Sequence, residues 1–240
     1  MKAALLGIDK ATGGHPIGYV VDLRSNPGGL LDQAVDVADD FLNSGEVVSQ
    51  RGRTKDDIER YYARPGDMAH GLPVIVLTDA GTASASEIVA GALQDHHRAL
   101  IMGETSFGKG SVQTVVQTGP DAALRLTTAR YYTPSGRSVQ AGGIEPDIMV
   151  PQLSDPDYKD RPVIREADLR KHLLAQSQVK DKLLETDSTP DPRFTAKAED
   201  LKKQGIKDFQ LHYALNTLKR LAGPAPAAVA SGGPSSKKSR

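Results

Sequence analysis

The 240-residue chain lacks several features on which particular kinds of chemistry and binding depend. It contains no cysteine, which excludes disulfides, thiolate zinc sites and a cysteine nucleophile. No apolar run reaches the ~18 residues of a membrane span. Thirty basic and thirty acidic residues give a net charge of zero, so the whole chain exerts no net electrostatic attraction on nucleic acid or an anionic membrane. We therefore expect no nucleic-acid partner and no membrane span.

The N-terminus also lacks a targeting signal, because its apolar stretch is too short for a signal peptide. The first ten residues indicate part of a helix, and no capping residue precedes them. We therefore expect the chain to be a piece of a longer protein.

Short apolar runs alternate with helical patterns in the first hundred residues. The expected strands are 17–23, 72–78 and 99–102, and the expected helices are 31–42 and 84–93. Strands that alternate with helices favour an α/β fold with a parallel sheet. A polar stretch at 50–71 indicates a loop or a small β feature, and 111–132 alternates as antiparallel strands do.

The character of the chain changes after about residue 151. Residues 164–174 and 196–222 show charged, amphipathic helical patterns. The segment 223–240 is too poor in apolar groups to order itself. We therefore divide the chain into a core at 1–150, a helical C-terminal extension at 151–222 and a disordered tail at 223–240. The two C-terminal helices also offer a surface through which the chain could form a homo-oligomer.

Ser84 and Lys109 are the candidate nucleophile and base. None of the six histidines lies in a motif that suits a Ser-His-Asp triad. Lysine can take the proton of a serine hydroxyl if its surroundings remove its charge. The alternative for Ser84 is structural, since Ser84-x-x-Glu87 before an apolar run is a helix capping box. The alternative for Lys109 is a solvated lysine in a turn.

The loop that contains Lys109 also has the spacing of a phosphate-binding loop. Residues 103–109 match G-x-x-x-x-G-K, but such a loop continues with Ser or Thr, and position 110 is glycine. The residues that follow indicate a strand, whereas a phosphate-binding loop opens a helix. Nucleotide binding is therefore the less favoured interpretation.

Other candidate residues have simpler explanations. The turn Asn26–Gly29 could direct backbone amides at a substrate oxygen, or it could only end a strand. Glu87 and Asp95 could be surface charges on the helix after Ser84. His96 and His97 have no partner at metal-ligand spacing.

Five motifs occur together in order along the chain. They are Asp22-Leu23-Arg24-Ser25-Asn26-Pro27-Gly28-Gly29, Ser84-Ala85-Ser86-Glu87-Ile88, the segment 103–113 around Lys109, Tyr131-Tyr132-Thr133-Pro134-Ser135-Gly136-Arg137 and Gly143-Ile144-Glu145-Pro146-Asp147-Ile148. Over roughly residues 3–150 the chain thus resembles the carboxyl-terminal processing (tail-specific) serine peptidases.

The resemblance implies a ClpP/crotonase-like core that carries a Ser-Lys dyad. By motif position, Ser84 would be the nucleophile and Lys109 the general base. Gln113 matches a glutamine that helps to orient the lysine, and Asp95 matches an acidic position implicated in some members. The oxyanion hole would consist of the backbone amides of Ala85 and of either Gly28 or Gly29.

The resemblance also implies what the parent protein does. It would be an endopeptidase of the periplasm or cell envelope that cleaves proteins at or near unstructured C-terminal tails, with no metal or organic cofactor. Members usually carry an upstream PDZ domain and a core strand before the first helix, and we expect this chain to lack both. The alternative is a non-catalytic or inactive fragment of the same fold that acts as a binding or scaffold module.

Overall fold

The computed structural model describes residues 1–54, 56–169, 173 and 191–223. Its centre is a four-stranded sheet in the order β1-β4-β5-β8, and all three neighbouring pairs are parallel. The strands are β1 (Tyr19–Asp22), β4 (Val74–Thr78), β5 (Leu100–Gly103) and β8 (Ile148–Met149). Three of them confirm strands expected from the sequence, whereas β8 was not expected. β1 lies at an edge of this sheet.

Helices cover one face of this sheet. They are α1 (Lys2–Ala11), α2 (Leu31–Asp39) and α3 (Ala85–Asp95), which confirm the three expected in the first hundred residues. Side chains along β4 point alternately to the two faces of the sheet, so Val74 and Val76 pack in the hydrophobic core between the sheet and helices α2 and α3. Tyr19 on β1 donates its hydroxyl proton to Asp9 of α1 at 2.7 Å.

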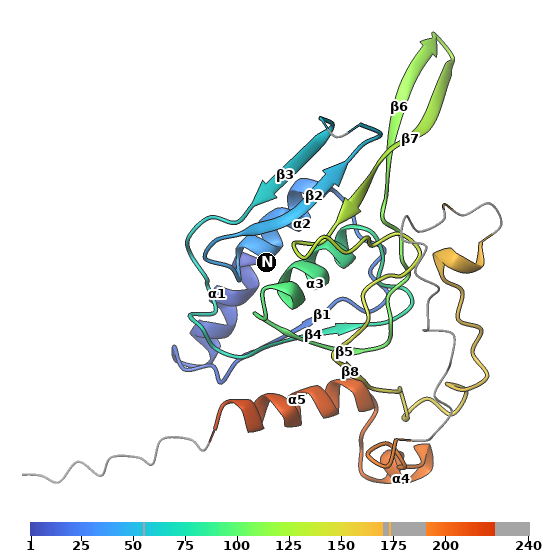
Figure 1. Cartoon of the computed structure of the whole chain (residues 1–240). Helices are drawn as coiled ribbons and strands as arrows, with labels where there is room; N and C mark the ends of the chain where they lie inside the picture. Colours follow the sequence, from blue (N-terminus) through green and yellow to red (C-terminus); the bar gives the residue numbers. More distant parts are fainter. Residues whose placement is uncertain (55, 170–172, 174–190, 224–240) are drawn as a thin grey trace, which may run out of the picture.

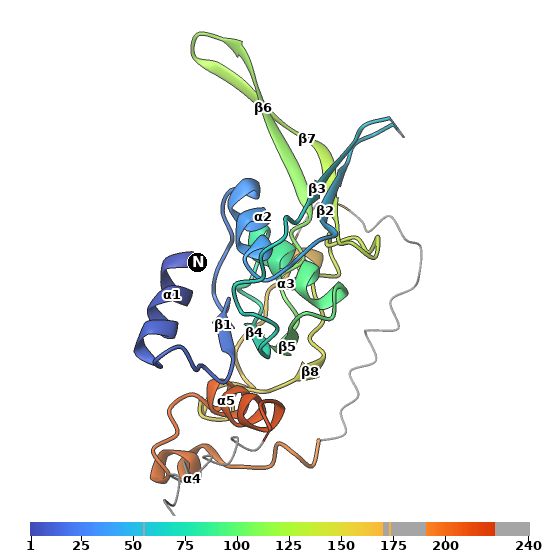
Figure 2. The same ribbon diagram turned by 90° about the vertical axis from the view of Figure 1, so that its left-hand side faces the viewer.

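A second, antiparallel sheet packs on the far side of α2 and α3 (Figure 1). Its order is β3-β2-β7-β6, built from β2 (Glu46–Arg51), β3 (Ile58–Tyr62), β6 (Ser111–Gly119) and β7 (Ala122–Tyr132). The small β feature expected at 50–71 is the hairpin β2–β3. The β6–β7 hairpin extends away from the body of the molecule in both views (Figures 1 and 2).

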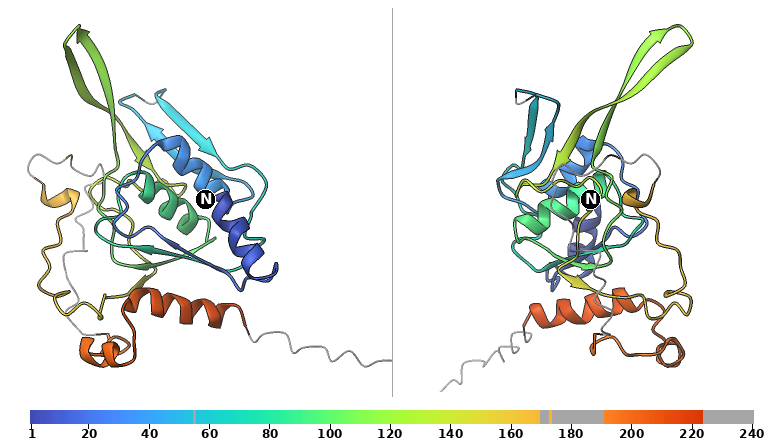
Figure 3. Two further views of the ribbon diagram at one scale, coloured as in Figure 1. Left: turned by 180° about the vertical axis from the view of Figure 1, so that it is seen from behind. Right: turned by 45° about the vertical axis from the view of Figure 1, so that its right-hand side comes forward.

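The C-terminal region covers the opposite face of the parallel sheet. Its two helices are α4 (Ala198–Lys203) and α5 (Phe209–Leu221), and α5 runs beneath the sheet in every view (Figure 3). Ile75 and Leu77 of β4 pack with Phe209 and Leu218 of α5 in one buried cluster. The extension therefore completes the core. The two helices that we expected to offer an oligomer surface pack apolar side chains on the chain's own sheet, and a homo-oligomer stays a prediction.

Two expectations about this region were wrong. The helical pattern at 196–222 is two helices, because Gly205 takes a positive φ of 75° after α4 and Asp208 caps α5 through the Leu211 N–H. In the described part of 164–174, the only helical turn is a short 3₁₀ segment at Glu166–Asp168. The expected tail at 223–240 lies outside the described residues, apart from Gly223. None of the described helices is long and apolar enough to cross a membrane.

Candidate active site

Ser84 stands at a sharp turn between β4 and α3. It is the residue before the first turn of α3, and its backbone has φ 55° and ψ −118°. Such a conformation is costly for a residue with a side chain and persists only where the surroundings enforce it. A strained serine between a strand and a helix is also the geometry that exposes a nucleophilic hydroxyl above a sheet edge. The Ser84 side chain is half-buried.

Glu87 holds this turn from inside the protein. Its side chain is completely buried, so the expectation of a surface charge was wrong. One carboxylate oxygen accepts the backbone N–H of Ser84 at 2.8 Å, as a capping box requires. The same oxygen accepts the backbone N–H of Lys109 at 2.9 Å. The backbones of the two candidate dyad residues are therefore adjacent, although 25 positions separate them in the sequence.

The other oxygen of Glu87 fixes the loop ahead of the lysine. It accepts the N–H of Gly108 at 2.7 Å and the hydroxyl of Ser106 at 2.5 Å. Burial raises the pKa of the Glu87 carboxyl above its ordinary value, and the hydrogen bonds from Ser106 and three backbone amides oppose that shift. Ser106 is buried as well and accepts the N–H of Ile144 at 2.7 Å.

The Lys109 side chain is exposed to solvent. Among the described residues, no hydrogen bond or ion pair engages its Nζ, and none joins it to Ser84 Oγ. The Phe107 N–H donates to the carbonyl oxygen of Thr82 at 2.9 Å, which brings the lysine loop against the turn that carries Ser84. The structure thus places the two backbones together without a bond between the side chains.

The turn Asn26–Gly29 lies directly against the turn that carries Ser84. A Cβ added to Gly28 would lie 2.6 Å from both the Ala83 carbonyl oxygen and the Ala85 nitrogen, and Gly28 has a φ of +91°. Only glycine fits there. The Gly28 N–H donates to the Asn26 side chain at 3.0 Å, whereas a Cβ on Gly29 would meet open space. The Ala85 N–H belongs to the first turn of α3, where amides have no partner within the helix.

Asp95 and Gln113 are not at this junction. Asp95 ends α3, about 16 Å along the helix axis from Ser84. It accepts the Ser135 N–H at 2.9 Å and pairs with Arg137 at 3.4 Å, so it fixes the segment after β7. Partial burial raises the pKa of Asp95, but hydrogen bonds from Thr133 and Ser135 outweigh it and lower the value. Gln113 is exposed on β6.

A cavity of about 630 Å³ opens near the turn that carries Ser84, at the carboxyl ends of the parallel strands. Ser25, Asp79, Gly81 and Glu104 are among the residues that line it. Burial and the nearby Asp79 charge raise the pKa of Glu104. Within the part of the chain that the structure describes, no cluster of three or more His, Asp or Glu side chains could hold a metal ion.

Sequence reasoning found the position of Glu87 but missed its role. The spacing Ser84-x-x-Glu87 predicted a cap, but it could not show that the carboxylate also binds the lysine loop. A signal was present in the residues that follow, because Ile88, Val89 and Ala90 leave this part of the helix no polar face.

Comparisons with known proteins identify the family of this chain. A family model for peptidase family S41 matches residues 6–150. A carboxy-terminal-processing protease of Bartonella bacilliformis is 58% identical over 162 residues, which cover 67% of this chain and 37% of that protein. A carboxyl-terminal-processing protease of Synechocystis sp. is 42% identical over 135 residues, covering 56% of this chain and 31% of the relative. The chain therefore belongs to peptidase family S41.

The solved structures agree with the family. The photosystem II D1 C-terminal processing protease is 37% identical, with a TM-score of 0.57 over 62% of this chain and 38% of that one. This similarity confirms the expected ClpP/crotonase-like α/β fold. The chain spans about a third of the length of the curated relatives it matches.

Proposed function

We propose that this chain is the catalytic part of a serine endopeptidase that cleaves proteins at or near unstructured C-terminal tails. The observation that supports this most directly is the junction at Glu87, where one carboxylate oxygen binds the amides of both Ser84 and Lys109. A buried group that fixes a strained serine beside a lysine has little use in a module that only binds.

In the proposed reaction, Ser84 Oγ attacks the carbonyl carbon of the scissile bond. Lys109, acting in its neutral form, takes the hydroxyl proton. The Ala85 N–H and an amide of the 26–29 turn, Gly29 in our proposal because the Gly28 N–H is already bonded, donate to the negative oxygen. When the C–N bond breaks, the Lys109 ammonium returns the proton to the leaving amine.

The second half of the reaction releases the acyl group. A water molecule attacks the ester carbonyl while Lys109 takes its proton. The Ser84–acyl bond then breaks, and the proton returns to Ser84 Oγ. Both halves require the exposed lysine side chain to turn towards Ser84, and the adjacent backbones bring this within the reach of side-chain rotation.

Two further residues take supporting roles in this proposal. Gln113 lies four residues after Lys109, and we propose that it orients the turned lysine. Asp95 acts at a distance as a positioning residue, because it fixes the segment after β7 through Ser135 and Arg137.

For the parent protein we propose the periplasm or cell envelope, although the relatives include a chloroplastic peptidase of Tetradesmus obliquus.

Site-directed variants test this function. Cleavage of an unfolded protein with a tail tag should fall by about a thousandfold or more in Ser84→Ala and in Lys109→Ala. Ser44→Ala and Lys10→Ala change exposed residues of the same types and serve as matched controls. Full activity in Lys109→Ala would remove the lysine from the mechanism.

The alternative is a non-catalytic module of the same fold. It is favoured by one observation, the exposed Lys109 side chain that makes no bond to Ser84. A chain that binds tailed proteins but cleaves none, with the same affinity before and after Ser84→Ala, would establish this alternative.

A further inference from the structure

The two turns that carry the proposed oxyanion amides meet beside Asp79. One turn follows β1 and runs through Ser25 to Gly29, and the other follows β4 and runs from Asp79 to Ser84. Because β1 and β4 are parallel neighbours, their carboxyl ends and the turns that follow lie at the same edge of the sheet. The turns belong to different strands, so contacts between them fix the distance from one to the other.

Asp79 joins the two turns through its side chain. Its Oδ1 accepts the Ser25 N–H at 2.7 Å and the Gly81 N–H at 2.9 Å. Its Oδ2 accepts the Ser25 hydroxyl at 3.1 Å. An aspartate that bonds the backbone two residues further on shapes its own turn. The same carboxylate therefore shapes the turn after β4 and holds the turn after β1 by two further bonds.

Ser25 has a backbone conformation that needs such support. Its φ is +54°, in the left-handed region that residues with a side chain seldom occupy. A conformation of this kind persists only where the surrounding groups enforce it. Asp79 bonds both the N–H and the hydroxyl of Ser25, so its loss would let this residue relax towards a commoner φ.

Backbone contacts carry this position on towards the candidate nucleophile. The Ala83 N–H donates to the Asn26 carbonyl oxygen at 3.0 Å. A Cβ on Gly81 would lie 2.9 Å from Ser25 Cα, so the two backbones approach closely there as well. A shift at Ser25 would therefore move Gly29, the proposed second oxyanion donor, relative to the serine four residues along from Asp79's neighbour Ala80.

We propose that Asp79 is a positioning residue of the peptidase reaction, which sets the distance between the Gly29 N–H and Ser84. The proposal deepens the proposed function and rests on it, because an oxyanion hole needs donors fixed where negative charge develops. A donor displaced by about 1 Å loses much of its effect on the transition state. The bound substrate carries little charge on its carbonyl oxygen, so its affinity depends less on this donor.

Steady-state cleavage of an unfolded, tail-tagged protein tests the proposal. Asp79→Ala removes the acceptor of both N–H groups and should lower kcat about thirtyfold, with KM unchanged within about twofold. Asp79→Asn keeps a carbonyl oxygen for these N–H groups. Its NH₂ group faces the Ser25 hydroxyl, which can turn to accept, so kcat should stay within about threefold of the unmutated chain.

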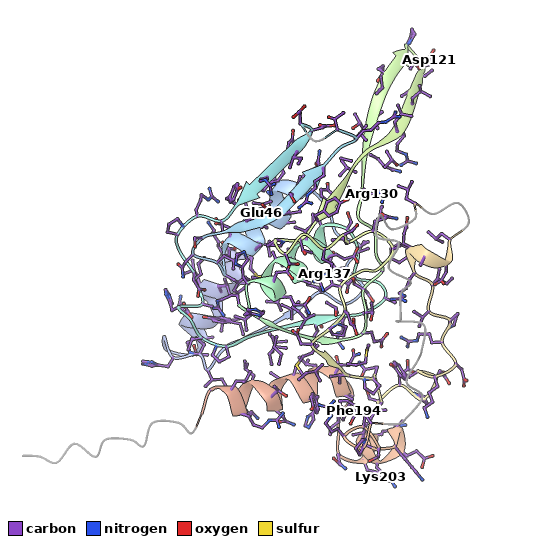
Figure 4. All side chains as sticks on the ribbon, in the orientation of Figure 1. Glu46, Asp121, Arg130, Arg137, Phe194 and Lys203 are labelled. Carbon is purple, nitrogen blue, oxygen red and sulfur yellow. The ribbon has the colours of Figure 1, made fainter. Side chains whose placement is uncertain are left out.

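The matched control is Asp191→Ala, which also removes an aspartate that caps a turn. Asp191 accepts the Arg193 N–H at 2.9 Å, and Figure 4 shows Phe194 of the same turn beneath the central sheet, near α4. This turn lies outside the candidate active site, so neither kcat nor KM should change in the control.

Amide hydrogen exchange, measured by NMR, follows the two turns without catalysis. The Ala83 N–H is protected while the Asn26 carbonyl oxygen lies against it. Its exchange should become about tenfold faster in Asp79→Ala, because the turns separate more often. In Asp79→Asn and in Asp191→Ala the exchange rate should be that of the unmutated chain.

Each outcome decides the proposal. An unchanged kcat in Asp79→Ala, a loss confined to KM, or an Asp79→Asn variant as slow as Asp79→Ala would overturn it. Should Asp79→Ala fail to fold by circular dichroism, Gly81→Ala takes its place, because its Cβ would push Ser25 away and cause the same loss of kcat. An unmutated chain that cleaves nothing would refute the proposed function. The exchange of the Ala83 N–H then decides alone whether Asp79 holds the turns together, and an unchanged rate in Asp79→Ala would overturn that claim.

Discussion

Glu87→Gln is the substitution that probes the organisation of the site most sharply. Glutamine keeps the shape of the side chain but replaces one accepting oxygen by an NH₂ group, which can only donate. In the structure, one oxygen of Glu87 meets two N–H donors, from Ser84 and Lys109. The other meets the Ser106 hydroxyl and the Gly108 N–H. If the NH₂ group faces Ser84 and Lys109, two backbone donors face a donor; if it faces the loop, the Gly108 N–H faces a donor while the Ser106 hydroxyl can turn to accept.

The expected cost follows from these four contacts. A buried donor left without an acceptor costs about 1–3 kcal/mol, and at least one is left in the variant. Removing a buried negative charge recovers part of this loss. We therefore expect the free energy of unfolding to fall by about 2 kcal/mol. Because the amide disturbs either the common anchor of Ser84 and Lys109 or the bond to Gly108 that holds the lysine loop, we also expect kcat/KM for cleavage to fall about a hundredfold.

Urea unfolding and cleavage of an unfolded protein substrate measure the two effects. The matched control is Glu199→Gln, which makes the same substitution at an exposed glutamate in the first turn of α4. Its free energy of unfolding should change by no more than about 0.5 kcal/mol. If Glu87→Gln behaves like Glu199→Gln in both assays, Glu87 does not organise this site and the reasoning fails.

Two further predictions concern the oxyanion turn and the C-terminal helix. Gly28→Ala should lower the free energy of unfolding in urea by about 2 kcal/mol and abolish cleavage, because its Cβ would meet the Ala85 nitrogen. In the control Gly29→Ala the Cβ meets open space, so the free energy of unfolding should stay within about 1 kcal/mol of the unmutated chain. Equal stabilities of the two variants would refute the close approach of Gly28 to Ala85. Partial burial raises the pKa of Asp208, but hydrogen bonds from Arg24, the Leu211 N–H and Gln152 outweigh this effect and lower the pKa to about 2. Asp208 therefore contributes stability above about pH 4 that is lost as the pH falls towards 2. Asp208→Asn should cost about 1 kcal/mol at pH 7 and only a small part of that at pH 2 in urea titrations, and a loss independent of pH would contradict this ion pair.

The order of elements was predictable because short apolar runs and helical periodicity are local properties. Residues 74–77 are four consecutive apolar residues, and so short a run next to turn residues favours a buried strand. The turn at Asn26–Gly29 and the helix after Ser84 were predictable for the same reason.

Other features depend on contacts between distant parts of the chain. Glu87 appeared as a cap because its partner loop lies about 20 residues further along, and spacing carries no information on that contact. The long helical pattern near the C-terminus could not reveal that Phe209 and Leu218 cover the central sheet. The pairing of Arg51 with Arg130 depends on the register of β2 against β7, which alternation alone does not fix.

The central claim, that Lys109 activates Ser84, is tested most directly by covalent labelling. A fluorophosphonate probe reacts with an activated serine, and peptide mass spectrometry locates the modified residue. We predict that the label appears on Ser84, that Lys109→Ala slows its attachment by about a hundredfold or more, and that Lys10→Ala leaves the rate unchanged. Labelling of Ser84 at the same rate in Lys109→Ala, or no labelling of Ser84 in the unmutated chain, would contradict the account.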